Sequence, residues 1–433
     1  MLGGGIWTTQ NKILPGAYIN FISAANTDVA LSDRGIATVP VSLDWGESGK
    51  VFSLTTDRFT RDAFEWFGYD YDAPELTPIR ELFKHAQKVF FYRMNGEGVK
   101  ASNTVGKAKY PGTRGNDIKI TVAQNVDNTA KFDVTAYLGT KTIDHQTVAS
   151  AAELVDNDFI EYEKSATLKV ASSTPMTGGT NSDVTTKQYS DYLSAMESYA
   201  FNTMGVASTD DTVKKLVAAY VRRMRDTVGK KFQAVLYQYA GDYEGIISVE
   251  NRVTDSTNEA NAVYWVTGAE AGCSVSGSVM NMTYDGEYAI NVDYKQSELE
   301  DAIGAGKFMF HRVGDEVRVL MDLNTLKTFT ADKGEVFQDN QTIRVTDQIA
   351  NDIATLFNNK YLGKVPNDEA GRSALWVDLC KYHDKLMQLR AIEGFTDKDI
   401  TVSQGADKRS VVVGDNITVV NAMAKLYMAV VVA

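Results

Sequence analysis

A strand–helix–strand pattern in the middle of the chain constrains the fold more than any other feature. Residues 203–207 and 232–239 are short apolar runs with the character of buried strands. Between them, apolar residues recur every three to four positions, as in an amphipathic helix: Val213, Leu216, Val217, Tyr220, Val221 and Met224. A strand, a helix and a second strand in this order form a parallel crossover. The sequence therefore predicts a parallel α/β sheet at the centre of the protein.

Residues 99–181 have a different pattern. Apolar and polar side chains alternate in the runs 118–122 and 132–136, which is typical of strands with one buried face. Thr, Asp and Lys fill the gaps, and residues 177–181 close the block with two glycines. We predict a sandwich-like all-β domain inserted between two α/β segments.

Three more helices are predicted after the central crossover. A capping box at residues 297–300 indicates one helix start, and the apolar spacing after Thr346 indicates another. A third helix spans about residues 368–392. Its predicted buried stripe consists of Leu375, Leu379, Tyr382, Leu386 and Leu389.

The chain is thus expected to be a multidomain α+β and α/β protein, with mixed α/β core domains, the inserted all-β domain and extended arms at both ends. Its 433 residues suit about three domains at roughly 150 residues each. The expected boundaries are 1–20 for an N-terminal arm, 21–98 and 182–345 for the two parts of the core, 99–181 for the inserted all-β outer domain, 346–424 for a C-terminal domain and 425–433 for a C-terminal arm strand.

Both ends of the chain lack partners within a predicted core. The N-terminal arm contains a turn followed by a short extended piece, formed by Leu14, Pro15, Gly16, Tyr18 and Ile19. The C-terminal end is a β-prone apolar run that includes Leu426, Met428, Val430 and Val432. An apolar terminal strand promotes aggregation unless something pairs with it. It pairs either within its own domain or with another chain by strand addition, and the residues alone leave both alternatives open.

The composition excludes several classes of function. Fifty-six acidic residues outnumber 44 basic ones and give a net charge of −12, whereas nucleic-acid-binding proteins usually have a basic surface. No apolar run approaches the roughly 20 residues of a membrane-spanning helix, and residues 1–6 lack the pattern of a signal peptide. We therefore expect no direct contact with nucleic acid, no membrane insertion, and synthesis in a cytoplasm.

Residues that could support catalysis or metal binding do not complete a motif. Residues 304–307 are followed by Phe308, where a phosphate-binding loop needs Ser or Thr. Residues 272–276 lack the second glycine of a nucleophile elbow. Cys380 and His383 lie three positions apart, but zinc needs about four ligands and no second pair is near in sequence. We predict no catalytic site, no metal and no cofactor, and so no enzyme.

Short motifs along nearly the whole chain carry a family resemblance. They are Pro-Gly-Ala-Tyr-Ile at 15–19, Lys-Tyr-Pro-Gly-Thr-Arg-Gly-Asn-Asp-Ile at 109–118, Gly-Gly-Thr-Asn at 178–181, Asp-Leu-Asn-Thr-Leu at 322–326, Ile-Arg-Val at 343–345 and Tyr-Leu-Gly-Lys-Val-Pro-Asn at 361–367. Together they resemble the sheath proteins of contractile phage tails and R-type bacteriocins, in the subgroup from Gram-positive hosts. One departure is Leu323, which stands where that family has Ile.

The resemblance implies a structural subunit without an active site. Such a subunit polymerises helically around an inner tail tube protein and contracts to drive the tube through a cell envelope. Its two arms complete a β-sheet in a neighbour's C-terminal domain. The implied partners are further copies in stacked hexameric rings, the tube, the baseplate and the tail terminator. The implied location is a virion tail or bacteriocin particle assembled in the host cytoplasm.

Two other readings compete with the sheath: a hydrolase-like α/β enzyme with a β insertion, and a surface-adhesion module. If the protein is a sheath, the helix over 368–392 is the candidate tube-facing element. Lys381, Lys385 and Arg390 lie off its apolar stripe and could meet an acidic tube. Polar contacts suit an interface that must later release, because exposed ion pairs are each worth only about 0.2–1 kcal/mol.

Overall fold

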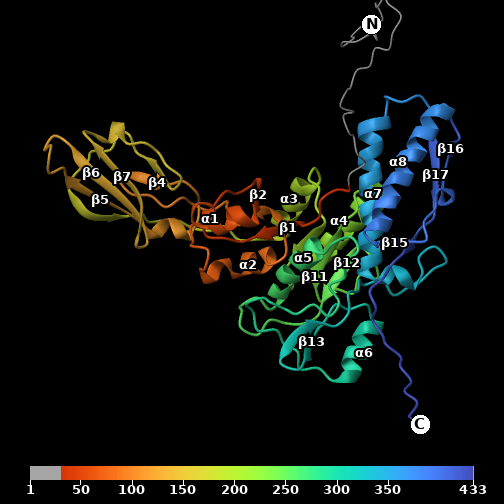
Figure 1. Ribbon diagram of the computed structural model, residues 1–433. Coiled ribbons are helices and arrows are strands. Elements are labelled where there is room, and N and C mark those ends of the chain that lie inside the picture. The colour runs from red at the N-terminus through yellow and green to blue at the C-terminus, as the bar shows by residue number, and fades with distance from the viewer. Residues whose placement is uncertain (1–30, 433) are drawn as a thin grey trace, which may run out of the picture.

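The computed structural model describes residues 31–432. The molecule is elongated, with a β-sandwich at one end, a helix-covered sheet in the middle, and a domain of two long helices and small β-hairpins at the other end (Figure 1). The predicted fold class, mixed α/β parts with an inserted all-β domain, is confirmed. Within the described residues, none of the helices is both long and apolar enough to cross a bilayer.

The central sheet has six strands in the order β12-β11-β10-β1-β3-β2. Every neighbouring pair is parallel except β2 with β3. The strands are β1 (Ile36–Val41), β2 (Val51–Thr55), β3 (Lys88–Arg93), β10 (Thr203–Val206), β11 (Gln233–Tyr237) and β12 (Ile246–Val249). The predicted crossover is β10, then α4 (Asp211–Arg222), then β11, and β10 and β11 pair in parallel as expected.

Helices cover both faces of this sheet. On one face α3 (Thr186–Met196) and α4 pack against Ala234 and Leu236 of β11. On the other face α5 (Ala262–Gly272) packs against Val235 and Tyr237, and α1 (Thr56–Phe67) and α2 (Thr77–Phe83) cover the β2–β3 side. Since successive strand residues point to opposite faces, a strand buried on both faces reads as an uninterrupted apolar run. That is why residues 232–239 showed no alternation.

The β-sandwich is inserted between β3 and α3. A four-stranded antiparallel sheet, in the order β7-β6-β5-β9, is joined by a two-stranded sheet of β4 and β8. The strands are β4 (Gly106–Ala108), β5 (Ile118–Gln124), β6 (Phe132–Leu138), β7 (Lys141–Val148), β8 (Ile160–Tyr162) and β9 (Ala171–Pro175). Alternate residues of β5 are buried, which confirms the one-sided pattern.

In sequence, α6 (Gln296–Gly304) and the hairpin of β13 (Phe310–Val313) and β14 (Glu316–Val319) follow the central sheet and precede the C-terminal domain. The hairpin turns at Gly314, whose φ is 60°. The predicted capping box is two positions too late. Lys295 is the N-cap, and the Glu298 carboxylate accepts a hydrogen bond from its backbone N–H.

The C-terminal domain is built on α7 (Asn340–Leu356) and α8 (Glu369–Gln388), which lie side by side (Figure 1). Four short strands follow: β15 (Ile392–Glu393), β16 (Ile400–Gln404), β17 (Val411–Asp415) and β18 (Thr418–Val419). Helix α7 begins six residues before the predicted Thr346, because the Asp339 side chain caps it at the backbone N–H of Gln341. Its first turns carry polar residues that are buried, and an apolar-periodicity search misses such a start.

Candidate functional site

Both ends of the described chain are attached to α7. The Gln348 side-chain amide donates to Ser32, to its Oγ at 2.7 Å and to its carbonyl oxygen at 3.1 Å. Seven residues toward the helix N-terminus, Gln341 donates to the carbonyl of Val420 and accepts from the N–H of Ala422, both at 2.9 Å. One helix therefore holds the points from which the two terminal segments leave the fold.

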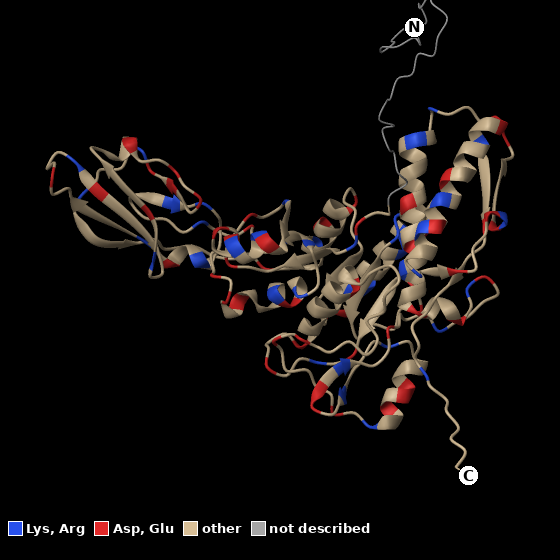
Figure 2. Cartoon of the chain, viewed as in Figure 1, with Lys and Arg blue, Asp and Glu red and all other residues tan. Residues whose placement is uncertain are grey.

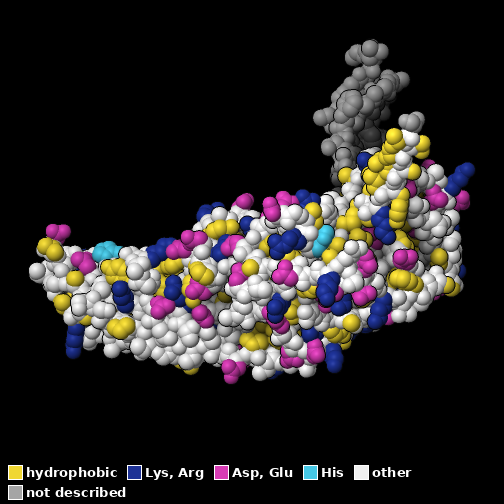
Figure 3. All heavy atoms as spheres, turned by 90° about the horizontal axis from the view of Figure 1, so that it is seen from below, with side chains coloured by type: hydrophobic (Ala, Val, Ile, Leu, Met, Phe, Trp, Pro, Cys, Tyr) yellow, Lys and Arg dark blue, Asp and Glu magenta, His cyan; other side chains and the backbone are white. Residues whose placement is uncertain are grey.

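The segment after Val420, which we call the C-terminal tail (residues 421–432), has no partner within the described chain that would cover its apolar side chains. Leu426, Met428, Val430 and Val432 are between 71% and 89% exposed, and no strand is assigned after β18. In Figure 3, hydrophobic side chains gather at the end of the molecule formed by the C-terminal domain. A soluble protein seldom exposes so continuous an apolar run unless it meets a partner.

The hairpin of β16 and β17 offers such a tail a place to bind. Its strands pair only with each other among the described residues, so both outer edges have unpaired backbone groups. One face packs on α8 through the buried Ile400, while Val412 is 55% exposed. Asn367, in the motif between α7 and α8, donates to the carbonyls of Lys408 and Ser410 and so fixes the hairpin's loop to the helices. A firmly held hairpin with open edges can accept an added strand.

The inner side of α7 is tied to the central sheet by a buried ionic cluster. Arg344 donates to Glu270 of α5 at 2.6 Å and to Asp322 at 3.2 Å, and all three side chains are at most 2% exposed. Burial, and then the charge of Asp322, raises the pKa of Glu270 well above its ordinary value. Burial opposes ionisation of Asp322 too, but the Arg344 guanidinium and hydrogen bonds from Asn340 and the Val279 backbone together lower the pKa of Asp322. Within the cluster, burial thus favours the neutral form of Glu270, whereas the surrounding donors favour the ionised form of Asp322.

This cluster joins two of the sequence motifs. Asp322 opens the motif at 322–326 and Arg344 lies in the motif at 343–345. Neither motif indicated that the two would be in contact, and neither pointed to Glu270 as the third member of the cluster. The available signal was a single acidic residue inside the otherwise apolar segment of α5. A second ion pair joins Arg225, in the turn after α4, to Asp347 of α7, with a distance of 2.8 Å between the guanidinium and the carboxylate.

The entry and exit motifs of the β-sandwich also meet. Asn116 and Gly179 exchange two hydrogen bonds of 2.9 and 2.8 Å. Asn181 donates to Asp44 of the core at 2.7 Å. Gly112 has φ 139°, and a Cβ there would lie 1.9 Å from the Asp44 carbonyl oxygen, so only glycine fits. The motifs at 109–118 and 178–181 thus form the junction between the sandwich and the core.

An aromatic side chain from the core closes this junction. Trp45, which is fully buried, packs against Tyr110 and Phe159 of the sandwich at ring-centroid distances of 5.4 and 5.8 Å. Phe64 of α1 contacts the same Phe159 at 5.3 Å. Arg93 at the end of β3 is buried and donates to the carbonyls of Leu43 and Gly46, which holds the Trp45 loop in place. The sandwich is therefore packed onto the core over a shared apolar cluster.

The structure places the predicted tube-facing residues at the C-terminal half of α8 and just beyond it. Lys381 is exposed, Lys385 is half-buried, and Arg390 is exposed after the helix end with φ 60°. Figure 2 shows basic and acidic residues interspersed along α7 and α8. Of the predicted apolar stripe, four residues are buried; Leu389 is 48% exposed, because α8 ends at Gln388.

Cys380 and His383 do not share a ligand. His383 is fully buried, its Nδ1 is 2.9 Å from the Leu379 carbonyl oxygen, and its Nε2 is 3.0 Å from a carboxylate oxygen of Asp415. It therefore ties α8 to β17. Among residues 31–432, no group of three or more His, Cys, Asp or Glu side chains could hold a metal ion. The predicted N-terminal arm residues, Leu14, Pro15, Gly16, Tyr18 and Ile19, lie outside the described residues.

A multidomain α/β subunit with an inserted sandwich, an uncovered apolar tail and an open-edged hairpin has the architecture of a protein that assembles with its own copies. Family comparison agrees. The chain matches the phage tail sheath protein central domain at 182–325, the phage tail sheath C-terminal domain at 332–433, the sheath β-sandwich domain at 95–182, and the N-terminal region of domain III of the tail sheath protein Gp18 at 34–94. The chain belongs to the phage tail sheath protein family.

Individual relatives support the same assignment. The phage-like element PBSX protein XkdK of Bacillus subtilis is 32% identical, with 99% of each chain aligned. The crystal structure of the sheath tail protein from Desulfitobacterium hafniense superposes with a TM-score of 0.85 at 36% identity, covering 95% of this chain and 99% of that one. The contracted helical sheath of the anti-feeding prophage shares the fold alone, with a TM-score of 0.55 at 12% identity over 97% of this chain and 99% of that one.

The protein is thus a tail sheath protein of the contractile tail and injection systems, and part of a phage tail or phage-like particle. Its relatives include sheath proteins from Gram-positive bacteria. The family is structural, so the hydrolase-like alternative is set aside.

Proposed function

We propose that this chain is the repeating subunit of a helical sheath of stacked hexameric rings around an inner tube. The observation that carries the proposal is the apolar C-terminal tail. Its side chains are uncovered in the single chain, although the residue before it, Val420, is hydrogen-bonded to α7. Contraction of the sheath drives the tube through the target envelope. The baseplate and the tail terminator are the partners at the two ends of the assembly, which forms in the host cytoplasm.

The tail and the N-terminal arm link the subunits by strand exchange. The acceptor is the β16–β17 hairpin of a neighbour, whose two outer edges have room for one added strand each. Leu426, Met428, Val430 and Val432 alternate with other positions, so an added strand would place all four on one face. From the N-terminal arm, Leu14, Pro15, Gly16, Tyr18 and Ile19 supply the second strand.

Deletion of residues 1–20 is expected to leave a folded, soluble monomer that no longer polymerises, because the hydrophobic clusters described for residues 31–432 supply the core of the subunit. Replacing Val430 with Asp should also abolish assembly, since burying an unpaired carboxylate in the new sheet is strongly unfavourable. Val126→Asp is the matched control: Val126 is 92% exposed on the sandwich and lies outside both arms. Electron microscopy and analytical ultracentrifugation measure the outcome. Tubes formed by the truncated protein would refute strand exchange.

The tube-facing surface is the C-terminal half of α8 and the residues just beyond it, and it includes Lys381, Lys385 and Arg390. Reversing two of these charges, Lys381→Glu with Lys385→Glu, should weaken co-assembly with an acidic tube, and more strongly at low salt than at moderate salt because exposed charges are screened. Contacts between sheath subunits should persist. The control Lys107→Glu with Lys169→Glu changes the net charge equally on the sandwich, where both lysines are exposed. Co-assembly that is unchanged at both salt concentrations would remove α8 from the tube interface.

A further inference from the structure

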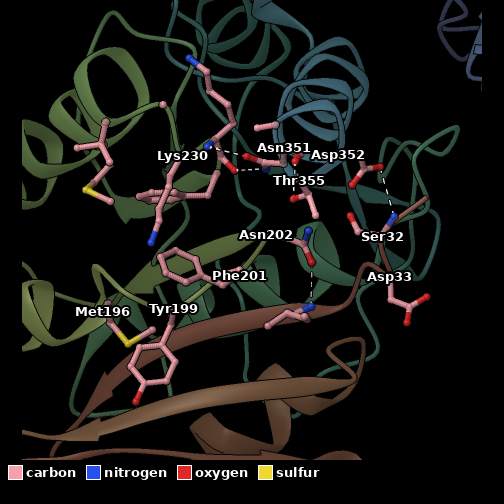
Figure 4. Close-up of a pocket in the computed structure, with 18 of the residues that line it drawn as sticks. Ser32, Asp33, Met196, Tyr199, Phe201, Asn202, Lys230, Asn351, Asp352 and Thr355 are labelled. Atoms are coloured by element: carbon pink, nitrogen blue, oxygen red, sulfur yellow. Dashed lines mark hydrogen bonds between the residues drawn. The ribbon is translucent and has the colours of Figure 1, made fainter. Parts of the chain in front are cut away.

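A cavity of about 470 Å³ opens between the central sheet and α7 (Figure 4). It lies where the strands β1, β10 and β11 begin, and its lining comes from the end of α3, the turn after α4 and the outer side of α7. Its size is within the range of pockets that bind a ligand or a peptide segment.

The floor of this cavity is apolar. Met196, Phe201, Met224 and Phe232 line it from the central domain, and Val228, which is 50% exposed, stands at its edge. Ala354 of α7 faces it from the opposite side and is exposed. Exposed apolar side chains around a hollow favour an apolar occupant.

One wall of the cavity is basic. Lys230 and Lys231 line it, and the partners of their ammonium groups are backbone carbonyls, of Glu197 and Arg225 respectively. Neither lysine forms a salt bridge with a carboxylate among the described residues. The two carboxylates of the lining, Asp33 and Asp352, lie at the side of the cavity near Ser32 (Figure 4). An occupant with apolar side chains and one negative charge would complement the apolar floor and the basic wall.

The described chain begins at the rim. Ser32 and Asp33 both line the cavity, and the Ser32 N–H donates to Asp352 of α7 at 3.3 Å (Figure 4). Gln348, also on α7, donates to the Ser32 Oγ. The preceding ten residues read Phe-Ile-Ser-Ala-Ala-Asn-Thr-Asp-Val-Ala, from 21 to 30. They contain three large apolar side chains, at Phe21, Ile22 and Val29, and Asp28 is their single charged residue.

We propose that residues 21–30 of the same chain bind in this cavity, with the apolar side chains on its floor and the Asp28 carboxylate toward Lys230 and Lys231. Residue 30 is two positions from Ser32, and ten residues can span up to about 33–36 Å when extended, so the segment can reach every part of the lining. When bound, the segment shortens the N-terminal arm. When released, it lengthens the arm by up to that span. This consequence rests on the proposed strand exchange, whereas the binding itself is a property of the single subunit.

The experiment is a cysteine cross-link in the full chain. Ile22→Cys and Val228→Cys are introduced after the native thiols are removed by Cys273→Ala and Cys380→Ala. A matched protein carries Phe21→Ser and Val29→Ser in addition, which keeps the tether and the thiols but removes two apolar side chains. We expect the disulfide between positions 22 and 228 to form at least tenfold faster in the first protein than in the second. Circular dichroism of both proteins checks that they are folded.

Equal rates in the two proteins would overturn the proposal, because they would mean random collision of a tethered segment. A mixture of ¹⁴N-labelled and ¹⁵N-labelled chains identifies the occupant by mass spectrometry. Cross-links within one isotope support the same chain, and mixed cross-links would assign the cavity to a second copy and refute the proposal. The readout does not require polymerisation, so failure of strand exchange would leave this result unaffected.

Discussion

Replacement of Arg344 by Met is expected to lower the free energy of unfolding by about 3–5 kcal/mol, the usual cost of removing one partner from a buried ion cluster. Met has a similar length and is apolar, so the loss comes from the charge rather than from a cavity. The substitution would leave the buried Asp322 carboxylate without its cation. It would also separate α7 from α5, since Arg344 is bonded to Glu270. Urea unfolding followed by circular dichroism measures the change.

Glu270 provides the control. Burial raises the pKa of Glu270 well above its ordinary value, which favours the neutral carboxyl, and Glu270→Gln puts a neutral hydrogen-bonding group of the same shape in its place. We expect Glu270→Gln to cost about 1 kcal/mol or less, in the range of one neutral hydrogen bond. If Glu270→Gln proves as costly as Arg344→Met, the assignment of the charges within the cluster is wrong.

Replacement of Trp45 by Ala is expected to cost about 3–5 kcal/mol, as for other fully buried large aromatic residues. Trp45 fills the space between Gly68 of the core and the rings of Tyr110 and Phe159 in the sandwich. The substitution should therefore loosen the sandwich and lower the thermal unfolding temperature. Phe132→Ala, on the partly buried edge of the same cluster, should cost less. Differential scanning calorimetry distinguishes the two.

Trp45 also affects the result of removing the sandwich from the chain. Excision of residues 99–181 with a short linker is expected to leave the remaining chain folded and able to assemble, but it exposes Trp45 and Phe64. Excision combined with Trp45→Gln should therefore give more soluble protein than excision alone. Size-exclusion chromatography measures the soluble fraction. Loss of tube binding or of the assembly's inner diameter would show that the sandwich is not on the outside.

Patterns that depend on burial alone were predictable from the sequence. The β10–α4–β11 crossover was visible because α4 has an apolar stripe at every third to fourth position and both strands are continuous apolar runs. The sandwich was visible because its strands have one buried face. Both patterns follow from the spacing of side chains along one element.

Contacts between elements were not predictable in the same way. Arg225 follows Arg222 and Arg223 in a basic stretch of sequence, yet it is buried against Asp347, 122 positions away. The spacing of a charged residue gives no sign of whether a counter-charge will arrive from elsewhere in the fold. The early start of α7 was missed for the same reason: its first turns are polar, and tertiary hydrogen bonds such as Asn340 to Asp322 satisfy them.

Helix α7 also limits how the lattice can deform. A helix rises about 1.5 Å per residue, so the attachment points at Gln341 and Gln348 stay about 10 Å apart along a rod that hardly stretches. Arg344 and Asp347 lie between these points. They attach α7 to α5 and to the turn after α4, two segments that pack on the central sheet. If the terminal segments link the subunits as proposed, tension from a neighbour on either side passes through this one helix. The distance between the two attachment points then stays constant within each subunit while the subunits move relative to one another.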